Sequence, residues 1–478
     1  MKKLSFPIAL FAFVFTLRAA AAPSEEARHN WPQWRGPLAT GVAPEADPPL
    51  EWSESKNVRW KVAIPGAASS TPVVWGNRVF VLTAVSIGKK TEPQAEARQA
   101  GPPPLPPENP PPRAGNPPGE GGRPRGPGGP GGFGRPAEKP AEAYQFMVLC
   151  LDRNTGKTLW QKIARETAPH EGIQQNNTFA SASPVTDGQV VLAFFGSRGL
   201  HCYDLDGNLK WTKDFGQMQT KMTFGEGASP AMHGDTVIVD WDDETDSDFI
   251  AAFDRRNGKQ LWKTPRSEDT TWSTPLIVEH GGKFQVIVNA TRKVRSYDLA
   301  SGKELWSCAG QSPNAIPSPV ADADTVFVTS GFRGSALHAI DLSRTGDLTG
   351  TEAIRWGFSR TTPGFTPYVP SPLLVDGLLY LVKGNSGMFS CVETKSGTSH
   401  FEEQRLEGIS EIYASPVSAK DRVYVLSRDG KCLVLKKGPK LEILATNKLE
   451  DHTDASIALA GKDLFIRGRQ NLYCIAEK

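Results

Sequence analysis

Short apolar segments separated by tight polar turns follow one another through most of the chain, as in residues 190–194, 200–204 and 208–212. Segments of this length, bounded by Gly, Asn and Asp, are typical of β-strands joined by hairpins. One pattern, from Asp152 to Trp160, returns at residues 204–211, 254–262 and 298–306. It predicts a strand that ends at Asp, a turn in which Gly or Asn adopts the left-handed conformation, and a second strand that carries Trp. Such repetition indicates a fold built from copies of one unit.

A second pattern gives the number of copies independently. It is a small hydroxyl residue followed by Pro, at the start of an apolar strand. It stands at Thr71, Ser183, Ser229, Thr274, Ser318, Ser371 and Ser415, with a weaker eighth copy, followed by Ile, at Ser456. Most intervals are about 40 to 50 residues long and hold four short strands, as the blades of a β-propeller do. The sequence therefore predicts an all-β fold over residues 51–478, an eight-bladed β-propeller of four-stranded antiparallel blades.

The two ends of the repeat region complement each other. The last copy runs out at Lys478 after three strands, whereas residues 57–62 have the pattern of a fourth strand without the first three. We expect this N-terminal strand to complete the last blade and close the ring, which removes an exposed sheet edge. The repeated aromatic position is expected to pack between blades rather than to stack on a ligand. It is held by Trp60, Trp160, Trp211, Trp262, Trp306 and Trp356.

The start of the chain bears on its compartment. Residues 1–21 join two lysines, an apolar run and small residues, which predicts a signal peptide that is removed on export; residues 22–50 form an N-terminal extension. We expect an exported, soluble protein, periplasmic or extracellular, with no transmembrane segment. The net charge of +2 does not favour a nucleic-acid partner, and export argues against one.

The cysteines follow the repeat. Cys150, Cys202, Cys391 and Cys474 share one position, which other copies fill with Ala or Ser. A position that demands a small side chain, in different blades, predicts buried free thiols rather than a disulfide framework.

Residues 86–143 interrupt the first unit between its second and third strands. Within this range, residues 101–140 are dominated by Pro and Gly and hold hardly an aliphatic side chain. This composition buries too little apolar surface to offset the entropy of ordering, so we expect a disordered insertion. Two interpretations stay open: a tolerated surface insertion, or a mobile tether or lid that contacts another protein or the cell wall.

The loops at one end of the ring hold the candidate ligand-binding residues. Hairpins between second and third strands are expected to meet at the mouth of the axial funnel, and their tips carry Arg198, Arg292, Arg333, Lys383, Arg428 and Arg469. These cations form either an anion-binding rim or an ordinary solvated one. The loops that lead into the first strands add six aromatic residues: Phe179, Phe224, Trp272, Phe365, Tyr368 and Tyr413. With neighbouring amides, these either hold a sugar or flat ring or plug the channel.

One loop is acidic. Asp242, Asp243, Asp246 and Asp248 form a weak candidate calcium site, although the glycine and terminal Glu of a helix-loop-helix site are missing. A solvated hairpin is the alternative. The sequence shows no nucleophile elbow, zinc-ligand pattern or phosphate-binding loop, and no catalytic residue is predicted.

The repeat can be compared with a known family. Cys-Leu-Asp-Arg-Asn-Thr-Gly-Lys-Thr-Leu-Trp at 150–160 and Ser-Tyr-Asp-Leu-Ala-Ser-Gly-Lys-Glu-Leu-Trp at 296–306 resemble the repeat of pyrroloquinoline quinone (PQQ)-like eight-bladed propellers, the quinoprotein alcohol dehydrogenase-like superfamily. Residues 31–37, followed by Gly41, resemble the N-terminal segment of a subgroup of exported proteins with this propeller.

The resemblance implies two functional classes. Quinoprotein dehydrogenases use PQQ and calcium to oxidise alcohols or sugars, but this chain lacks their vicinal cysteine pair and haem-attaching Cys-x-x-Cys-His. The other class resembles the propeller subunit of the outer-membrane β-barrel assembly machinery, a non-catalytic scaffold. We therefore expect an exported, non-catalytic propeller without a cofactor. It would bind a protein or cell-envelope partner, or a small anionic or carbohydrate ligand, at the funnel mouth. A PQQ- and calcium-dependent dehydrogenase is the alternative.

Overall fold

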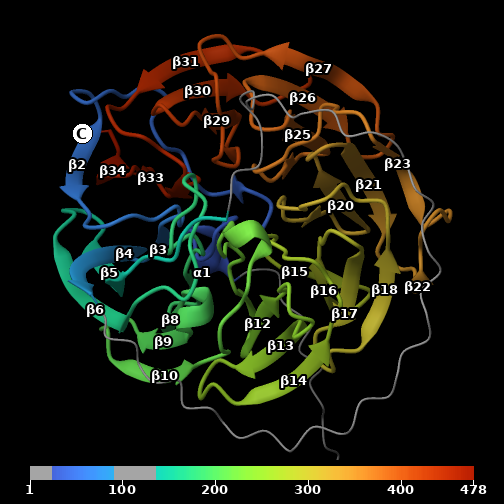
Figure 1. Cartoon of the computed structure of the whole chain (residues 1–478). Helices are drawn as coiled ribbons and strands as arrows, with labels where there is room; N and C mark the ends of the chain where they lie inside the picture. Colours follow the sequence, from blue (N-terminus) through green and yellow to red (C-terminus); the bar gives the residue numbers. More distant parts are fainter. Residues whose placement is uncertain (1–23, 91–135, 478) are drawn as a thin grey trace, which may run out of the picture.

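The computed structural model describes residues 24–90 and 136–477 and shows eight sheets arranged as a ring around a central axis (Figure 1). Each sheet has four antiparallel strands, which follow one another from the axis to the rim. Two sheets carry a short extra strand. The predicted eight-bladed β-propeller is confirmed. Within the described residues, the one α-helix is α1 (Glu25–Arg28), and no helix there combines the length and apolar character needed to cross a membrane.

The blades are numbered in chain order, and the four strands of each blade are given from the axis outward. Blades 1 to 4 are β3 (Val73–Trp75), β4 (Arg78–Lys90), β5 (Glu142–Asp152) and β6 (Thr158–Thr167); β7 (Val185–Thr186), β8 (Val190–Phe194), β9 (Leu200–Asp204) and β10 (Leu209–Lys213); β11 (Ala231–His233), β12 (Thr236–Trp241), β13 (Phe249–Asp254) and β14 (Gln260–Pro265); and β15 (Leu276–His280), β16 (Lys283–Val288), β17 (Val294–Asp298) and β18 (Glu304–Cys308). Short 3-10 helices, η1 (Gly196–Arg198) and η2 (Lys221–Thr223), lie in blade 2 and in the loop after it.

Blades 5 to 8 complete the ring. They are β19 (Val320–Ala321), β20 (Thr325–Ser330), β21 (Ser335–Asp341) and β23 (Ile354–Arg360); β24 (Leu373–Val375), β25 (Leu378–Val382), β26 (Met388–Glu393) and β27 (Ser399–Arg405); β28 (Val417–Ala419), β29 (Arg422–Leu426), β30 (Lys431–Lys436) and β31 (Ile443–Lys448); and β32 (Ala458–Ala460), β33 (Asp463–Arg467), β34 (Asn471–Ile475) and β2 (Val58–Ala63). The extra strands are β1 (Val42–Ala43), parallel to β28, and β22 (Gly346–Asp347), parallel to β18.

The ring closes as the sequence predicts. Strand β2, near the N-terminus, pairs antiparallel with β34, the last strand of the chain, and Trp60 lies opposite Cys474. In Figure 1 the C-terminus lies beside β2. The sheet edge that three strands alone would expose in blade 8 is therefore covered by the other end of the repeat region.

In five blades the Trp of the repeat is hydrogen-bonded to the next blade, whereas the Trp306 indole donates to Gln285 of its own blade at 3.0 Å. The indole N–H of Trp160 in blade 1 donates to the carbonyl of Leu205 in the turn of blade 2, at 2.9 Å. Trp60, Trp211, Trp262 and Trp356 make the same bond to the following blade at 2.8–2.9 Å. The expected packing of these rings between blades is confirmed. All six cysteines are buried free thiols, and the four that share a repeat position lie on the third strands of their blades.

The hydroxyl residues that stand before the first strand of each blade form a chain of hydrogen bonds around the axis. The backbone N–H of Ser183 donates to the hydroxyl of Ser229, and the N–H of Ser229 donates to Thr274, at 2.9 and 3.0 Å. Seven such bonds run among the described residues, each from one blade to the next, and Ser456 is the last acceptor. A hydroxyl at this position therefore fixes each inner strand to its neighbour.

The N-terminal extension enters the centre of the ring. Trp31 pairs with Val74 of β3 and is fully buried. The guanidinium of Arg35 donates to the carbonyls of Pro372 (2.8 Å), Pro416 (3.0 Å) and Thr40 (3.2 Å), and burial lowers the pKa of Arg35 to about 9. The segment is thus tied to the first strands of blades 1, 6 and 7, and it fills the axis from one end.

The predicted insertion and signal peptide lie mostly outside the described residues. Strand β4 continues to Lys90 and β5 begins at Glu142, inside the range 86–143 given to the insertion, while residues 91–135 are not described. The predicted signal peptide, residues 1–21, falls in the undescribed residues 1–23.

Candidate functional site

A cavity of about 830 Å³ lies at the end of the axis where the loops between blades converge. Its wall holds a residue that precedes the first strand of every blade: Ser69, Ser183, Ser229, Thr274, Ile316, Tyr368, Tyr413 and Ser456. The cavity is therefore a product of the whole ring, and its volume falls in the range of roughly 300–1,000 Å³ typical of small-molecule sites.

Aromatic side chains form much of the wall. Phe224 and Trp272 lie with ring centroids 6.3 Å apart, and Phe332 and Tyr368 stack at 5.0 Å. Tyr413 adds a fifth ring from blade 7. The structure thus brings together Phe224, Trp272, Tyr368 and Tyr413, four of the six aromatic residues that the sequence places at the mouth. Two further candidates pack elsewhere: Phe179 lies against Tyr144, and Phe365 against Phe358.

The N-terminal extension contributes one residue to the wall. Trp34 lines the cavity, and its indole N–H donates to the hydroxyl of Ser456, with 3.4 Å between Nε1 and Oγ. Sequence reasoning did not place Trp34 in the site, because its segment has no repeat partner. The Trp31 to Pro37 motif was the available signal.

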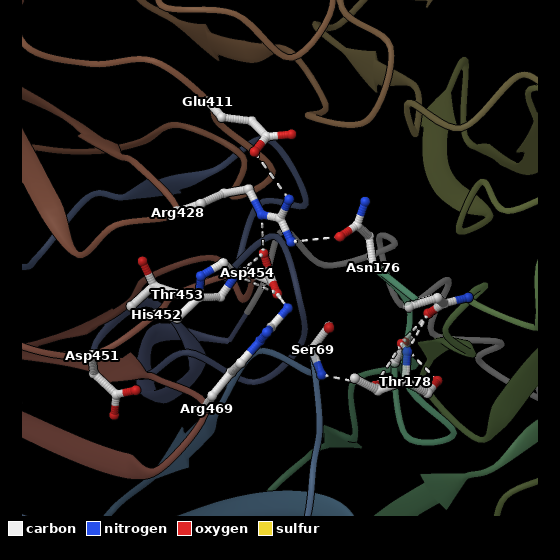
Figure 2. A network of polar contacts seen from close by, with 12 residues as sticks. Ser69, Asn176, Thr178, Glu411, Arg428, Asp451, His452, Thr453, Asp454 and Arg469 are labelled. Atoms are coloured by element: carbon white, nitrogen blue, oxygen red, sulfur yellow. Dashed lines mark hydrogen bonds and ion pairs between the residues drawn. The ribbon is translucent and has the colours of Figure 1, made fainter. Parts of the chain in front are cut away.

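A loop before blade 2 reaches across the rim of the cavity. Residues 174–177 line the cavity, and Figure 2 shows Asn176 facing Arg428 of blade 7, whose Nη2 lies 3.2 Å from the amide oxygen. Asn177 holds the base of the loop by donating to the carbonyls of Phe224 and Glu226. The loop therefore links two blades that are not neighbours in the ring.

Asp454 is the centre of a charged network at this rim (Figure 2). Its carboxylate accepts from Arg428 at 2.6 Å and from Arg469 at 3.4 Å, and the ring of His452 lies 3.1 Å away. Arg428 also donates to Glu411 at 3.0 Å and lies over the ring of Tyr413 at 4.0 Å. Burial acts against the charge of Arg428, but its hydrogen bonds and ion pairs with Asp454 and Glu411 outweigh burial and raise its pKa.

The other hairpin cations also have partners. Arg198 pairs with Glu226 at 2.9 Å, Arg292 with Asp269 at 3.0 Å and Lys383 with Glu403 at 2.6 Å. The guanidinium of Arg333 lies over the ring of Phe332 at 5.3 Å. Among the described residues, the cavity wall itself includes no Lys or Arg side chain. The six predicted rim cations thus each lie beside a carboxylate or an aromatic ring, and their anion-binding role stays a prediction.

The acidic loop of blade 3 is held by its own contacts. Asp242 accepts two bonds from the buried Arg266, at 2.6 and 2.8 Å. Asp243 accepts from Thr245 and Ser247, and Asp248 accepts from the backbone N–H of Asp243, while Asp246 adopts a left-handed φ of 58°. Within the described ranges, no group of three or more His, Cys, Asp or Glu side chains is arranged to hold a metal ion.

Beside this loop, Asp240 is fully buried and lies 3.3 Å from the Nε of Arg266. Burial comes first among the causes that raise its pKa well above the ordinary value; the charge of Asp242 adds to it, and Arg266 opposes it.

The residues of the cavity do not fit a PQQ-calcium pair. PQQ carries three carboxylates, which are best held by charge-assisted bonds from Arg or Lys, and calcium takes six to eight oxygen ligands. The described wall offers neither an Arg nor a Lys, and its one carboxylate, Asp454, is engaged by Arg428 and Arg469.

Comparison with known proteins agrees with the fold. A family model described as outer membrane protein assembly factor BamB matches residues 145–403 and 246–478. No curated protein matches the chain.

Three solved structures show the same architecture. A europium-containing methanol dehydrogenase is 10% identical, with 93% of this chain and 90% of that chain covered and a TM-score of 0.58. A quinohemoprotein alcohol dehydrogenase from Comamonas testosteroni is 11% identical, with 96% and 84% covered and a TM-score of 0.58. A computationally designed protein, Ika8, is 13% identical, with 72% and 94% covered and a TM-score of 0.50. At these identities the likeness concerns the fold alone.

Proposed function

We propose that this chain, which belongs to the PQQ-like β-propeller family whose model is described as outer membrane protein assembly factor BamB, is an exported, non-catalytic binding propeller. Its ligand, or a segment of a partner in the cell envelope, would occupy the axial cavity. One observation carries this proposal: a cavity of about 830 Å³ draws its wall from all eight blades and also includes Trp34 of the chain's own N-terminal segment.

The side chains around the cavity support a binding role over a catalytic one. A general base must be free to take a proton from its substrate. Asp454, the one carboxylate of the described wall, instead accepts hydrogen bonds from Arg428 and Arg469 and lies beside His452. These contacts favour a carboxylate that fixes the rim.

The alternative is a PQQ-dependent dehydrogenase. The architecture shared with the two alcohol dehydrogenases favours this alternative, because their propellers cover most of this chain. The wall opposes it, because the quinone's three carboxylates would meet aromatic rings and hydroxyls instead of unpaired cations.

A titration separates the two functions. PQQ and calcium are added to the purified protein, and quinone absorbance and dye-linked oxidation of a panel of alcohols and sugars are followed. We expect no saturable binding and no turnover. Saturable binding with turnover that is lost in Trp272→Ala, a variant of the cavity wall, would overturn the proposal. If Trp272→Ala leaves the binding of PQQ unchanged, the quinone binds outside the cavity.

A further inference from the structure

We infer that the axial cavity binds a neutral oligosaccharide, an inference that rests on the proposed binding function and names its ligand class. Three properties of the described wall point to this class of ligand: its aromatic rings, its hydroxyl donors and its charge.

Three rings of the wall are held in place by contacts within the protein. Trp272 is half-buried, and its indole N–H donates to the carbonyl of Gly225 at 2.7 Å, so its polar edge is already bonded to the protein. Phe332 and Tyr368 stack nearly parallel, at 26°. A pyranose ring presents C–H groups on its faces, and such groups pack well against aromatic faces that do not have to be ordered first.

The lower wall supplies polar contacts of the kind that a sugar uses. Ser183, Ser229, Thr274 and Ser456 line the cavity, and each hydroxyl accepts a backbone N–H from the neighbouring blade. A hydroxyl has one donor and two acceptor positions, so each keeps its own proton for a ligand oxygen. The amide side chains at 174–177 add donors and acceptors at the rim.

The same bonds disfavour an extended peptide as the occupant. A peptide that adds a strand needs a row of free backbone N–H and C=O groups. Around the axis, the N–H groups of Thr71, Ser183 and Ser229 already donate to hydroxyls of the next blade.

The charges of the described wall favour a neutral ligand. Asp454 is the only charged side chain among the described residues of the wall, and its charge is compensated by Arg428 and Arg469. A bound carboxylate or ammonium would lose its hydration without gaining an unpaired counter-ion, which costs free energy. A neutral, hydroxyl-bearing ring loses no such charge hydration.

The test uses the intact chain and defined probes: cellotriose, maltotriose and N,N′-diacetylchitobiose as neutral sugars, with digalacturonic acid as the charged counterpart. Binding is followed by calorimetry and by tryptophan fluorescence, which reports on Trp34 and Trp272. We expect at least one neutral probe to bind with a Kd well below that of the charged probe. Failure of all three neutral probes, or tighter binding of digalacturonic acid, would overturn the inference.

Two variants locate the site. Trp272→Ala is expected to weaken binding about tenfold or more, because an aromatic contact is worth roughly 1.4 kcal/mol. Phe284→Ala is the matched control, since Phe284 is a half-buried ring that stacks on His233 at the hairpin between β15 and β16, away from the mouth. Equal affinity of both variants would contradict the assignment.

A measurement on the unaltered protein covers the case in which Trp272→Ala does not fold. A bound sugar should protect Trp34 and Trp272 from oxidation by N-bromosuccinimide, read residue by residue by mass spectrometry, and should leave Trp160 unprotected. Oxidation of Trp34 and Trp272 that is unaffected by a bound sugar would place that sugar outside the cavity. If neither PQQ nor any sugar binds, the saccharide inference alone is wrong, and if PQQ binds with turnover, the proposed function itself fails.

Discussion

The turn glycine of the Asp-to-Trp repeat meets two demands at once. Gly207 has a φ of 83°, and a Cβ there would lie 2.7 Å from the indole of Trp160 in the preceding blade. Gly156, Gly258, Gly302 and Gly397 repeat this arrangement against Trp60, Trp211, Trp262 and Trp356. The glycine therefore allows the left-handed turn and also leaves room for the ring that joins two blades.

We predict that Gly207→Ala destabilises the fold far more than Gly234→Ala. Gly234 also has a positive φ, 55°, but a Cβ there would meet nothing within 4 Å. The left-handed backbone alone costs about 1–2 kcal/mol with a side chain, and overpacking against Trp160 adds roughly 1–3 kcal/mol. Urea unfolding of both variants measures the difference. Equal losses would show that the indole contact does not constrain this position.

Asp240 provides a second prediction at the scale of single residues. Its raised pKa means that the folded protein keeps a proton that the unfolded chain releases, so stability falls as the pH rises from the ordinary value of 3.8 toward the raised pKa. Asp240→Asn should remove this decline and stabilise the protein at neutral pH. Melting temperatures between pH 4 and 8 test the sign, and a lower melting temperature of the variant at pH 7 would refute it.

The neighbouring carboxylate is the control. Asp242 is fully buried and accepts two bonds from Arg266, at 2.6 and 2.8 Å. Asp242→Asn would leave the guanidinium without its bidentate partner, which is expected to cost about 3–5 kcal/mol. Two Asp→Asn changes two residues apart should therefore act in opposite directions.

At the scale of elements, the strands could be predicted because each blade repeats the same local chemistry. The Asp-x-x-x-Gly turn fixes one hairpin, and the hydroxyl-Pro pair marks the start of each inner strand, so even the incomplete eighth unit is found at Ser456. The N-terminal extension could not be placed in this way. Its path depends on long-range contacts such as the bonds from Arg35 to Pro372 and Pro416, which leave no periodic trace in the sequence.

The same distinction between repeat positions and long-range contacts applies to the candidate site. Trp272, Tyr368 and Tyr413 were found because each stands a few residues before a hydroxyl-Pro mark. The hairpin cations were located, but their acidic partners come from other loops, as Glu226 does for Arg198 and Asp454 for Arg428. Position along a repeat thus predicts where a side chain lies, whereas its electrostatic state depends on segments distant in sequence.

At the scale of the whole molecule, β2 decides whether the propeller is a closed ring. It pairs with β34 in blade 8, while its Trp60 donates to the carbonyl of Arg153 in blade 1 at 2.8 Å. Arg59 of β2 and Arg153 of blade 1 also both pair with Asp463 of blade 8, at 3.0 and 2.7 Å. Strand β2 therefore joins the first and last blades through backbone pairing and the hydrogen bond of the Trp60 ring, and the ion pairs with Asp463 add to this connection.

We predict that deletion of residues 51–65 gives an unfolded or aggregating product, because β34 would expose its backbone edge and blades 8 and 1 would separate. Light scattering coupled to size exclusion measures the state of association, and thermal melting measures the fold. Deletion of residues 24–29 is the control, since it also shortens the N-terminal part but removes α1, which has no buried residue. A monomeric 51–65 deletion with unchanged melting would mean that the ring holds without its closing strand. The contacts among the other seven blade interfaces would then suffice for stability.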